Sequence, residues 1–173
     1  MTSIIKVNTI QDVGGNNLLI SNGSGSITTN NIGGQNTPAF HAQKTDSQQS
    51  IAFETYTKVT FNNEILDTDS KYASDKFTPT VAGYYYVYGS WGINTSAEVF
   101  QMRCDIYKNG SSYQTGRSYS TELGTASVGA IVYLDADDYV EIYARQDRTG
   151  SASASIQHNE GQTFFGAYRI IGA

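Results

Sequence analysis

The chain has 173 residues, of which 11 are Lys or Arg and 16 are Asp or Glu, so its formal net charge is −5 at pH 7. This length suits one domain with a short additional segment, and an acidic chain without a run of basic residues lacks the electrostatics of a nucleic-acid-binding protein. No apolar run is long enough to cross a membrane, and the lone Cys104 excludes a disulfide framework. We therefore expect neither nucleic acid nor a membrane as a partner.

Residues 1–37 differ in composition from the rest of the chain, because they are rich in Gly, Asn, Ser and Thr and contain no aromatic residue. Short apolar bursts alternate with turn-forming glycine pairs, and such a segment cannot build its own core. We predict an extended N-terminal arm with brief strands that docks on another surface; the composition is equally compatible with a disordered leader. The residues expected to anchor the arm are Ile4, Ile5, Val7, Ile10, Leu18, Leu19 and Ile20.

Residues 38–173 have a β pattern throughout, since strand-length runs alternate with turn signals and a helical period is absent. Roughly eight to ten strands with close turns predict an all-β fold, an antiparallel β-sandwich or jelly roll. The predicted strands lie within residues 39–44, 51–61, 71–79, 83–93, 100–108, 112–120, 125–134, 138–146 and 162–172.

Two of the turns carry a specific prediction. Asn109 and Gly110 separate two strand-like runs, and this pair favours a two-residue hairpin in which both central positions have positive φ. The acidic stretch 134–140 also separates two strand-like runs, and we interpret it as a second hairpin.

The run 83–91 is apolar on both faces, which is unusual for an outer strand of a sandwich. Alternation places Tyr85, Val87 and Trp91 on one face and three other tyrosines on the opposite face. A strand that is apolar on both faces is normally buried on both. In a two-sheet sandwich only another subunit or a ligand can cover the second face, and we predict another subunit. The alternative is that these tyrosines are ordinary surface residues. The predicted interface residues are Tyr84, Tyr86 and Tyr88, together with Phe165 from the last strand.

Residues 61–93 resemble the signature of the C1q-like domain, the jelly roll shared with the tumour-necrosis-factor superfamily. The matching positions are Phe61, Asp67, Tyr72, Phe77, Gly83 and Tyr85. The chain departs from the family pattern in two places: the gap between Tyr72 and Phe77 is two residues short, and Val87 and Gly89 occupy positions that aromatic residues usually hold. The likeness resumes in 105–110, 126–142 and 163–170. The resemblance covers about residues 38–173 and implies a ten-stranded jelly roll that assembles as a homotrimer.

Residues 5–28 are similar to the leader of many virion structural proteins of marine and freshwater bacteriophages. This resemblance implies a virion component that is made in the host cytoplasm. The opening residues lack the pattern of a signal peptide, and a single cysteine fits a reducing site of synthesis. We therefore expect a location in the virion and no secretion through a signal peptide.

Catalytic and metal sites are weakly indicated. Neither His41 nor His158 lies in a G-x-S-x-G or H-E-x-x-H context, so we predict that the protein is not an enzyme. The sharpest carboxylate cluster is Asp135, Asp137 and Asp138, and three copies near a trimer axis could bind Ca²⁺. We favour an acidic turn without a metal, because the D-x-D-x-D-G spacing is absent, and therefore expect no cofactor.

These observations together predict a trimeric capsid decoration or cement protein of a bacteriophage. Its N-terminal arms would dock on the major capsid protein or another virion protein, and its jelly-roll knob would project outward. The alternative is the receptor-binding tip of a tail or head fibre that recognises a host surface glycan or protein. In that case Tyr113, Arg117 and Tyr119 would form a ligand-facing loop, since aromatic and Arg side chains dominate binding hot spots.

Overall fold

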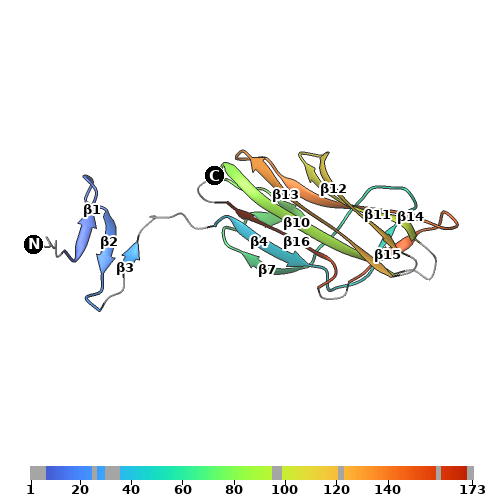
Figure 1. The fold of residues 1–173 in the computed structure, drawn as a ribbon, viewed down its shortest axis with the longest axis horizontal. Coiled ribbons are helices and arrows are strands. Elements are labelled where there is room, and N and C mark those ends of the chain that lie inside the picture. The colour runs from blue at the N-terminus through green and yellow to red at the C-terminus, as the bar shows by residue number, and fades with distance from the viewer. Residues whose placement is uncertain are drawn as a thin grey trace, which may run out of the picture. The chain divides into compact units, whose positions relative to one another are not determined.

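The computed structural model describes residues 7–24, 27–29, 36–94, 99–120, 123–158 and 161–170. Contacts within the chain divide it into two units, Met1–Gln35 and Asn36–Ala173, which are described separately (Figure 1). Of the apolar residues expected to anchor the arm, Ile4 and Ile5 lie outside the described residues.

The N-terminal unit contains a three-stranded antiparallel sheet in the order β1 (Thr9–Gln11), β2 (Asn17–Ser21) and β3 (Ile27–Thr29). Asp12 builds the turn between the first two strands, because its Oδ1 accepts hydrogen bonds from the backbone N–H groups of Gly14 and Asn16 at 2.8 and 2.9 Å. None of the side chains described in 7–24 is fully buried. The segment therefore forms brief strands but holds no core of its own there.

The second unit is a sandwich of two antiparallel sheets (Figure 1). Eight of its strands have five residues or more in the described part of the chain, and the others have two or three. The first sheet contains β4 (Ala39–Gln43), β5 (Gln49–Ile51), β7 (Asn63–Asp67), β10 (Gly83–Asn94), β13 (Gly124–Leu134), β15 (Ala154–Ile156) and β16 (Phe164–Arg169). The second sheet contains β6 (Thr57–Lys58), β8 (Tyr72–Ala73), β9 (Lys76–Phe77), β11 (Val99–Lys108), β12 (Ser111–Ser120) and β14 (Val140–Arg148). The all-β sandwich expected from the sequence is confirmed.

Strands β10 and β11 each lie between long neighbouring strands of their sheet. In the first sheet, β10 pairs with β13 along one edge and with β16 along the other. In the second sheet, β11 pairs with β12 on one side and with β14 on the other. Within the described residues, no helix is long and apolar enough to cross a membrane.

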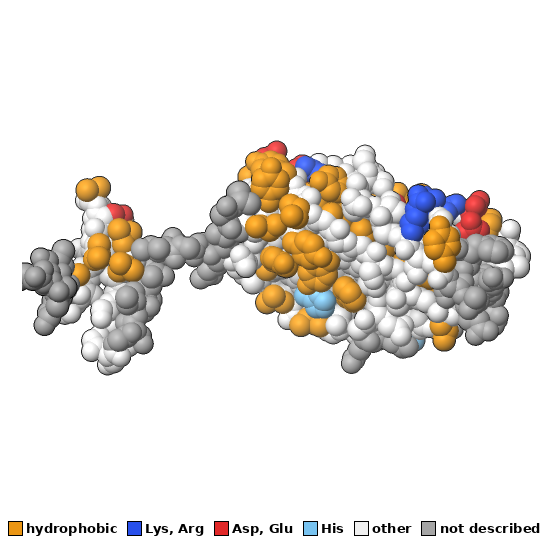
Figure 2. Space-filling view, viewed as in Figure 1, with side chains coloured by type: hydrophobic (Ala, Val, Ile, Leu, Met, Phe, Trp, Pro, Cys, Tyr) orange, Lys and Arg blue, Asp and Glu red, His pale blue; other side chains and the backbone are white. Residues whose placement is uncertain are grey.

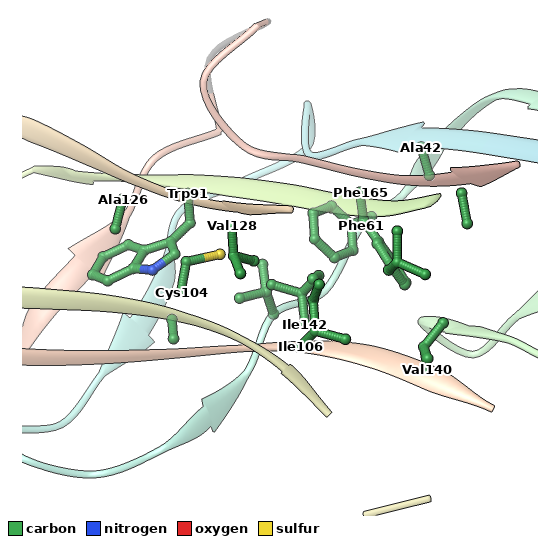
Figure 3. Packing of buried hydrophobic residues seen from close by; sticks show 14 of the residues in the cluster. Ala42, Phe61, Trp91, Cys104, Ile106, Ala126, Val128, Val140, Ile142 and Phe165 are labelled. Atoms are coloured by element: carbon green, nitrogen blue, oxygen red, sulfur yellow. The ribbon is translucent and has the colours of Figure 1, made fainter. Parts of the chain in front are cut away.

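The core lies between the two sheets, and aromatic rings fill the end near β4 and β9. The ring of Phe40 packs against those of Phe77 and Phe165, with centroids 4.6 and 4.7 Å apart. Farther along, Trp91 donates from Nε1 to the carbonyl oxygen of Arg103 at 2.8 Å and so links β10 to β11. Figure 3 shows Trp91, Cys104, Ile106 and Ile142 among the side chains between the layers.

The two predicted turns have different outcomes. Asn109 and Gly110 have φ of 51° and 77° and join β11 to β12, so the two-residue hairpin is confirmed. The stretch 134–140 is not a hairpin, because β13 pairs with β10 in the first sheet whereas β14 pairs with β11 in the second. This connection carries the chain from one sheet to the other.

Candidate functional site

The outer face of the first sheet is lined by aromatic side chains from adjacent strands. Along β10, Tyr85 and Val87 are fully buried between the sheets, so the tyrosines that alternate with them project outward. Side chains from β4, β13 and β16 join them by register. We define the aromatic face as His41, Tyr84, Tyr86, Tyr88, Tyr133, Phe164 and Tyr168.

The rings of the aromatic face contact one another. Tyr86 packs against Tyr88 and Tyr168, with centroid distances of 5.8 and 5.6 Å. The rings of Tyr88 and Phe164 lie 6.1 Å apart, and His41 lies 5.9 Å from both of them. Figure 2 shows the corresponding patch of hydrophobic side chains around a histidine on the jelly roll. The rings therefore form a continuous surface rather than isolated residues.

Two glycines on the flanking strands leave room for these rings. A Cβ atom on Gly129 of β13 would lie 2.6 Å from the hydroxyl oxygen of Tyr86, and one on Gly166 of β16 would overlap the ring and hydroxyl of Tyr88. Beside these rings, a hollow of about 490 Å³ opens between β10, β13 and β16. The small residues thus let the tyrosine rings lie flat on the sheet.

The aromatic face is polar only at its hydroxyl and imidazole groups. Nδ1 of His41 lies 3.1 Å from the hydroxyl oxygen of Tyr88, within hydrogen-bond distance. Partial burial lowers the pKa of His41 and raises the pKa of Tyr88, so both groups are neutral at pH 7. Neutral rings with polar tips suit a protein–protein contact that stays partly wet.

The interface prediction is wrong for Phe165. This side chain is fully buried in the core, where its ring packs against those of Phe40 and Phe61. Its neighbour Phe164 faces outward instead, because successive residues of a strand point to opposite faces. The sequence shows that this strand has two apolar faces, and only the pairing with β10 and β4 decides which of them points outward.

The three residues predicted in a ligand-facing loop lie on strand β12, so this prediction is wrong about the loop. The two-residue turn at Asn109 and Gly110 is so short that the chain pairs with β11 at once. Tyr113 donates from its hydroxyl to the carbonyl oxygen of Ile131 at 3.1 Å. Arg117 and Tyr119 are exposed on the outer face of the second sheet, where 71% of Tyr119 is accessible.

Local contacts stabilise the ionised carboxylate of Asp138 in the acidic connection between β13 and β14. Asp138 forms an ion pair with Lys108 at 2.8 Å, and it accepts hydrogen bonds from the Asn109 side chain and the Asp135 backbone at 2.6 and 3.0 Å. These contacts, led by the one with Lys108, lower the pKa of Asp138 to about 2. Within the described residues, no group of three or more His, Cys, Asp or Glu side chains could hold a metal ion. The Ca²⁺ alternative at Asp135, Asp137 and Asp138 required three copies of the chain and stays a prediction.

The sequence of the sandwich matches the C1q domain over residues 39–168, which is about three quarters of the chain. The chain belongs to the C1q domain family. No curated protein matches its sequence. The C1q-domain structure is nevertheless similar to several solved structures.

One of them, murine APRIL at pH 5.0, has a TM-score of 0.59 at 13% identity, and the match covers 76% of this chain and 98% of that one. Eiger TNF from S. frugiperda has a TM-score of 0.58 at 12% identity, with 78% and 93% covered. The globular domain of zebrafish complement 1qA protein has a TM-score of 0.52 at 17% identity, with 78% and 98% covered. At these identities the likeness shows the fold alone, and it supports the C1q-like jelly roll expected from residues 61–93.

Sequence reasoning identified the β10 part of the aromatic face and missed the part on other strands. His41, Tyr133, Phe164 and Tyr168 each lie in a predicted strand, but no local signal says which strands are neighbours. The small residues Gly129 and Gly166 offered a clue, because a glycine inside a strand often marks a place where another group approaches closely.

Proposed function

We propose that this C1q domain assembles as a homotrimer through the aromatic face. The observation that carries the proposal is the continuous set of outward rings on β10, β13 and β16, of which Tyr84, Tyr133 and Tyr168 are 39–44% exposed in the single chain. Exposed aromatic patches of this kind are typical of interaction surfaces. The resemblance to the C1q-like family, whose members form trimers, supports the same assembly.

We further propose that the trimer is a non-enzymatic structural component of a bacteriophage particle, a capsid decoration protein. The support comes from the N-terminal segment, which resembles virion-protein leaders and forms a unit of its own. In this unit 52% of Val7 and 44% of Ile10 are exposed, and Leu18, Leu19 and Ile20 are half-buried. Such side chains are available to a partner. In this proposal the partner is the major capsid protein or another virion protein.

The mechanism is attachment by several weak contacts at once. Each N-terminal unit supplies a few apolar side chains, which bind weakly on their own. Three units on one trimer raise the effective concentration for the second and third contacts, so the assembly binds far more tightly than one chain. The jelly-roll knob then projects from the particle.

Copy number in purified virions tests this function. Quantitative mass spectrometry would compare the chain with the major capsid protein of the particle that contains it. A capsid decoration protein is expected at about hundreds of copies, in multiples that the capsid symmetry sets. A few to a few tens of copies would contradict decoration and favour an appendage.

The second candidate function is the receptor-binding tip of a fibre. The exposed side chains of Arg117 and Tyr119 on the second sheet favour it, because Arg and Tyr are frequent in binding hot spots. In this case a low copy number is expected, and substitutions on the second sheet would abolish adsorption while assembly is unchanged.

A further inference from the structure

Three arginines lie side by side across the second sheet, although they are far apart in the sequence. Arg103 of β11 is the register partner of Arg117 on β12 and of Arg145 on β14. Directly opposite residues of antiparallel strands point to the same face, with Cβ atoms about 5 Å apart. Their inward neighbours Met102 and Cys104 are fully buried, so this row of guanidinium groups faces outward.

Placing like charges directly opposite one another destabilises a sheet, and the contacts of the described residues compensate the row only in part. Arg145 pairs with Glu54 at 3.1 Å. Arg103 donates to two neutral groups, the Gln101 side-chain oxygen at 2.6 Å and the Tyr56 hydroxyl at 2.9 Å. No ion pair among the described residues includes Arg103 or Arg117. The carboxylate of Asp105, two positions from Arg103 on β11, interacts with the charges of Arg103 and Arg117 without forming an ion pair with either. The three guanidinium groups therefore face two carboxylates, those of Glu54 and Asp105, and an external anion can neutralise the remaining positive charge.

Aromatic rings flank the row on both sides. The Arg145 guanidinium lies 5.9 Å from the centroid of the Tyr56 ring. The Tyr56 ring lies beside that of Tyr107, with centroids 6.1 Å apart, and the rings of Tyr107 and Tyr143 stack with centroids 4.0 Å apart. On the other side the Tyr119 hydroxyl accepts a hydrogen bond from Gln101 at 3.2 Å. Figure 2 shows Lys or Arg side chains gathered beside hydrophobic and acidic ones near β11 and β14.

We propose that the row Arg103, Arg117 and Arg145, with its flanking tyrosines, binds an acidic polysaccharide whose sugars carry carboxylate or sulfate groups. The planar guanidinium group binds such oxyanions through two parallel hydrogen bonds. The tyrosine rings offer flat apolar surfaces with polar tips, against which the C–H face of a sugar ring packs. The site lies on the sheet opposite the aromatic face, so the proposal depends on neither the trimer nor the virion.

The surroundings of the row favour a glycan over a nucleic acid or a membrane. Glu54, Glu141 and Asp147 lie on or beside the same sheet, and the whole chain has a net charge of −5. A continuous row of phosphates or an anionic lipid surface would bring many negative charges against these carboxylates. A polysaccharide with one anion per sugar places its charges at intervals, and its hydroxyl groups donate hydrogen bonds to the carboxylates.

Binding of the full-length chain to immobilised polysaccharides tests the proposal at about 0.15 M salt, where weak non-specific attraction is screened. The probes are chondroitin 4-sulfate for sulfate, polygalacturonate for carboxylate and dextran as a neutral control. We expect binding to at least one of the two acidic probes and none to dextran. Anionic phosphatidylserine vesicles and a single-stranded DNA oligomer are the competing ligand classes.

Arg117→Gln is the first variant, because Arg117 is exposed and its loss leaves the core unchanged. Arg103→Gln with Arg117→Gln is the second, with folding checked by thermal unfolding. We expect binding to the acidic probe to weaken about tenfold in the single variant and further in the double variant. Lys71→Gln removes the same charge beside the far edge strand β8, and we expect it to bind within about twofold of the original chain.

Three results would overturn the proposal: no binding to either acidic polysaccharide, equal loss in the Arg117→Gln and Lys71→Gln variants, or binding only to the vesicles or the DNA. None of these results gives information about the oligomeric state of the chain, which is measured separately. Failure of this inference is therefore distinguishable from failure of the proposed trimer.

Discussion

The two sheets approach each other closely at Gly116 of β12. A Cβ atom there would overlap the backbone carbonyl of Ser127 on β13, and a backbone cannot move aside as a side-chain end can. We expect Gly116→Ala to lower the free energy of unfolding by about 2–3 kcal/mol, because relief requires the sheets to separate. Urea unfolding measures this change.

Gly92→Ala is the matched control for that substitution. Its Cβ would lie 2.8 Å from the Oε1 atom of Gln162, which is the end of an exposed and flexible side chain. We expect a loss of about 1 kcal/mol or less. Equal losses in the two variants would mean that β12 and β13 do not pack as closely as the structure has them.

His41 gives the stability of the protein a pH dependence. Partial burial lowers its pKa in the folded chain below the ordinary value of 6.5, so the unfolded chain binds a proton first as the pH falls. Stability contributed by neutral His41 is therefore present above about pH 6.5 and is lost as the pH falls toward the lower folded-state pKa. We expect the melting temperature to fall between about pH 7.5 and pH 5, and to fall less in His41→Asn. The same pH slope in both proteins would contradict this assignment.

The turn that joins β11 to β12 is tied to the connection between β13 and β14. The Asn109 side chain accepts a hydrogen bond from the Tyr139 backbone at 2.9 Å and donates to Asp138 at 2.6 Å. Lys108, at the end of β11, pairs with Asp138 and also donates to the Tyr133 carbonyl at 2.8 Å. Two connections that are distant in the sequence thus brace one end of the sandwich.

Asp138→Asn tests this brace. The folded-state pKa of Asp138 is about 2, below the ordinary 3.8, so its contribution is present above about pH 4 and is lost as the pH falls through about 2. Because the pair is partly exposed, we expect a loss of about 0.5–1 kcal/mol at pH 7, which shrinks toward pH 2. Chemical unfolding of both proteins across this pH range measures it.

Asp137→Asn is the control in the same connection, because it removes an equal charge and Asn tolerates the positive φ of 76° found there. We expect its stability to stay within about 0.5 kcal/mol of the original chain. If Asp137→Asn loses as much as Asp138→Asn, the net charge of the connection matters rather than the contacts of Asp138.

These elements show what the sequence could predict and where prediction stopped. Alternation along residues 83–91 and the pair Asn109-Gly110 report local geometry, so the two faces of β10 and the first hairpin were predictable. The stretch 134–140 also signals a turn, but a turn does not say which sheet the next strand joins. The row of arginines could not be predicted from the sequence, because Arg103, Arg117 and Arg145 become neighbours only through strand pairing.

The jelly roll presents two different outer surfaces. The first sheet carries the aromatic face, whereas the second carries arginines, tyrosines and carboxylates. We expect the first surface to be covered by copies of the same chain and the second to stay open to solvent and ligands. This division of roles requires that the trimer form through the first sheet only.

Tyr86→Glu tests that division. In a trimer it would bury three carboxylates against the rings of neighbouring copies, and an unpaired buried charge is strongly unfavourable. We expect this variant to remain a folded monomer. Tyr119→Glu introduces the same change on the second sheet, where the side chain is 71% exposed, and we expect its oligomeric state to be unchanged.

Sedimentation equilibrium of the full chain tests the central claim most directly. The chain mass is 18.8 kDa, so the trimer formed through the aromatic face is expected as a single species of about 56 kDa, three times that mass. The mass should fall to that of one chain in Tyr86→Glu and stay at three chains in Tyr119→Glu. A single species at 18.8 kDa for the unsubstituted chain would contradict the trimer and leave the aromatic face without its proposed partner.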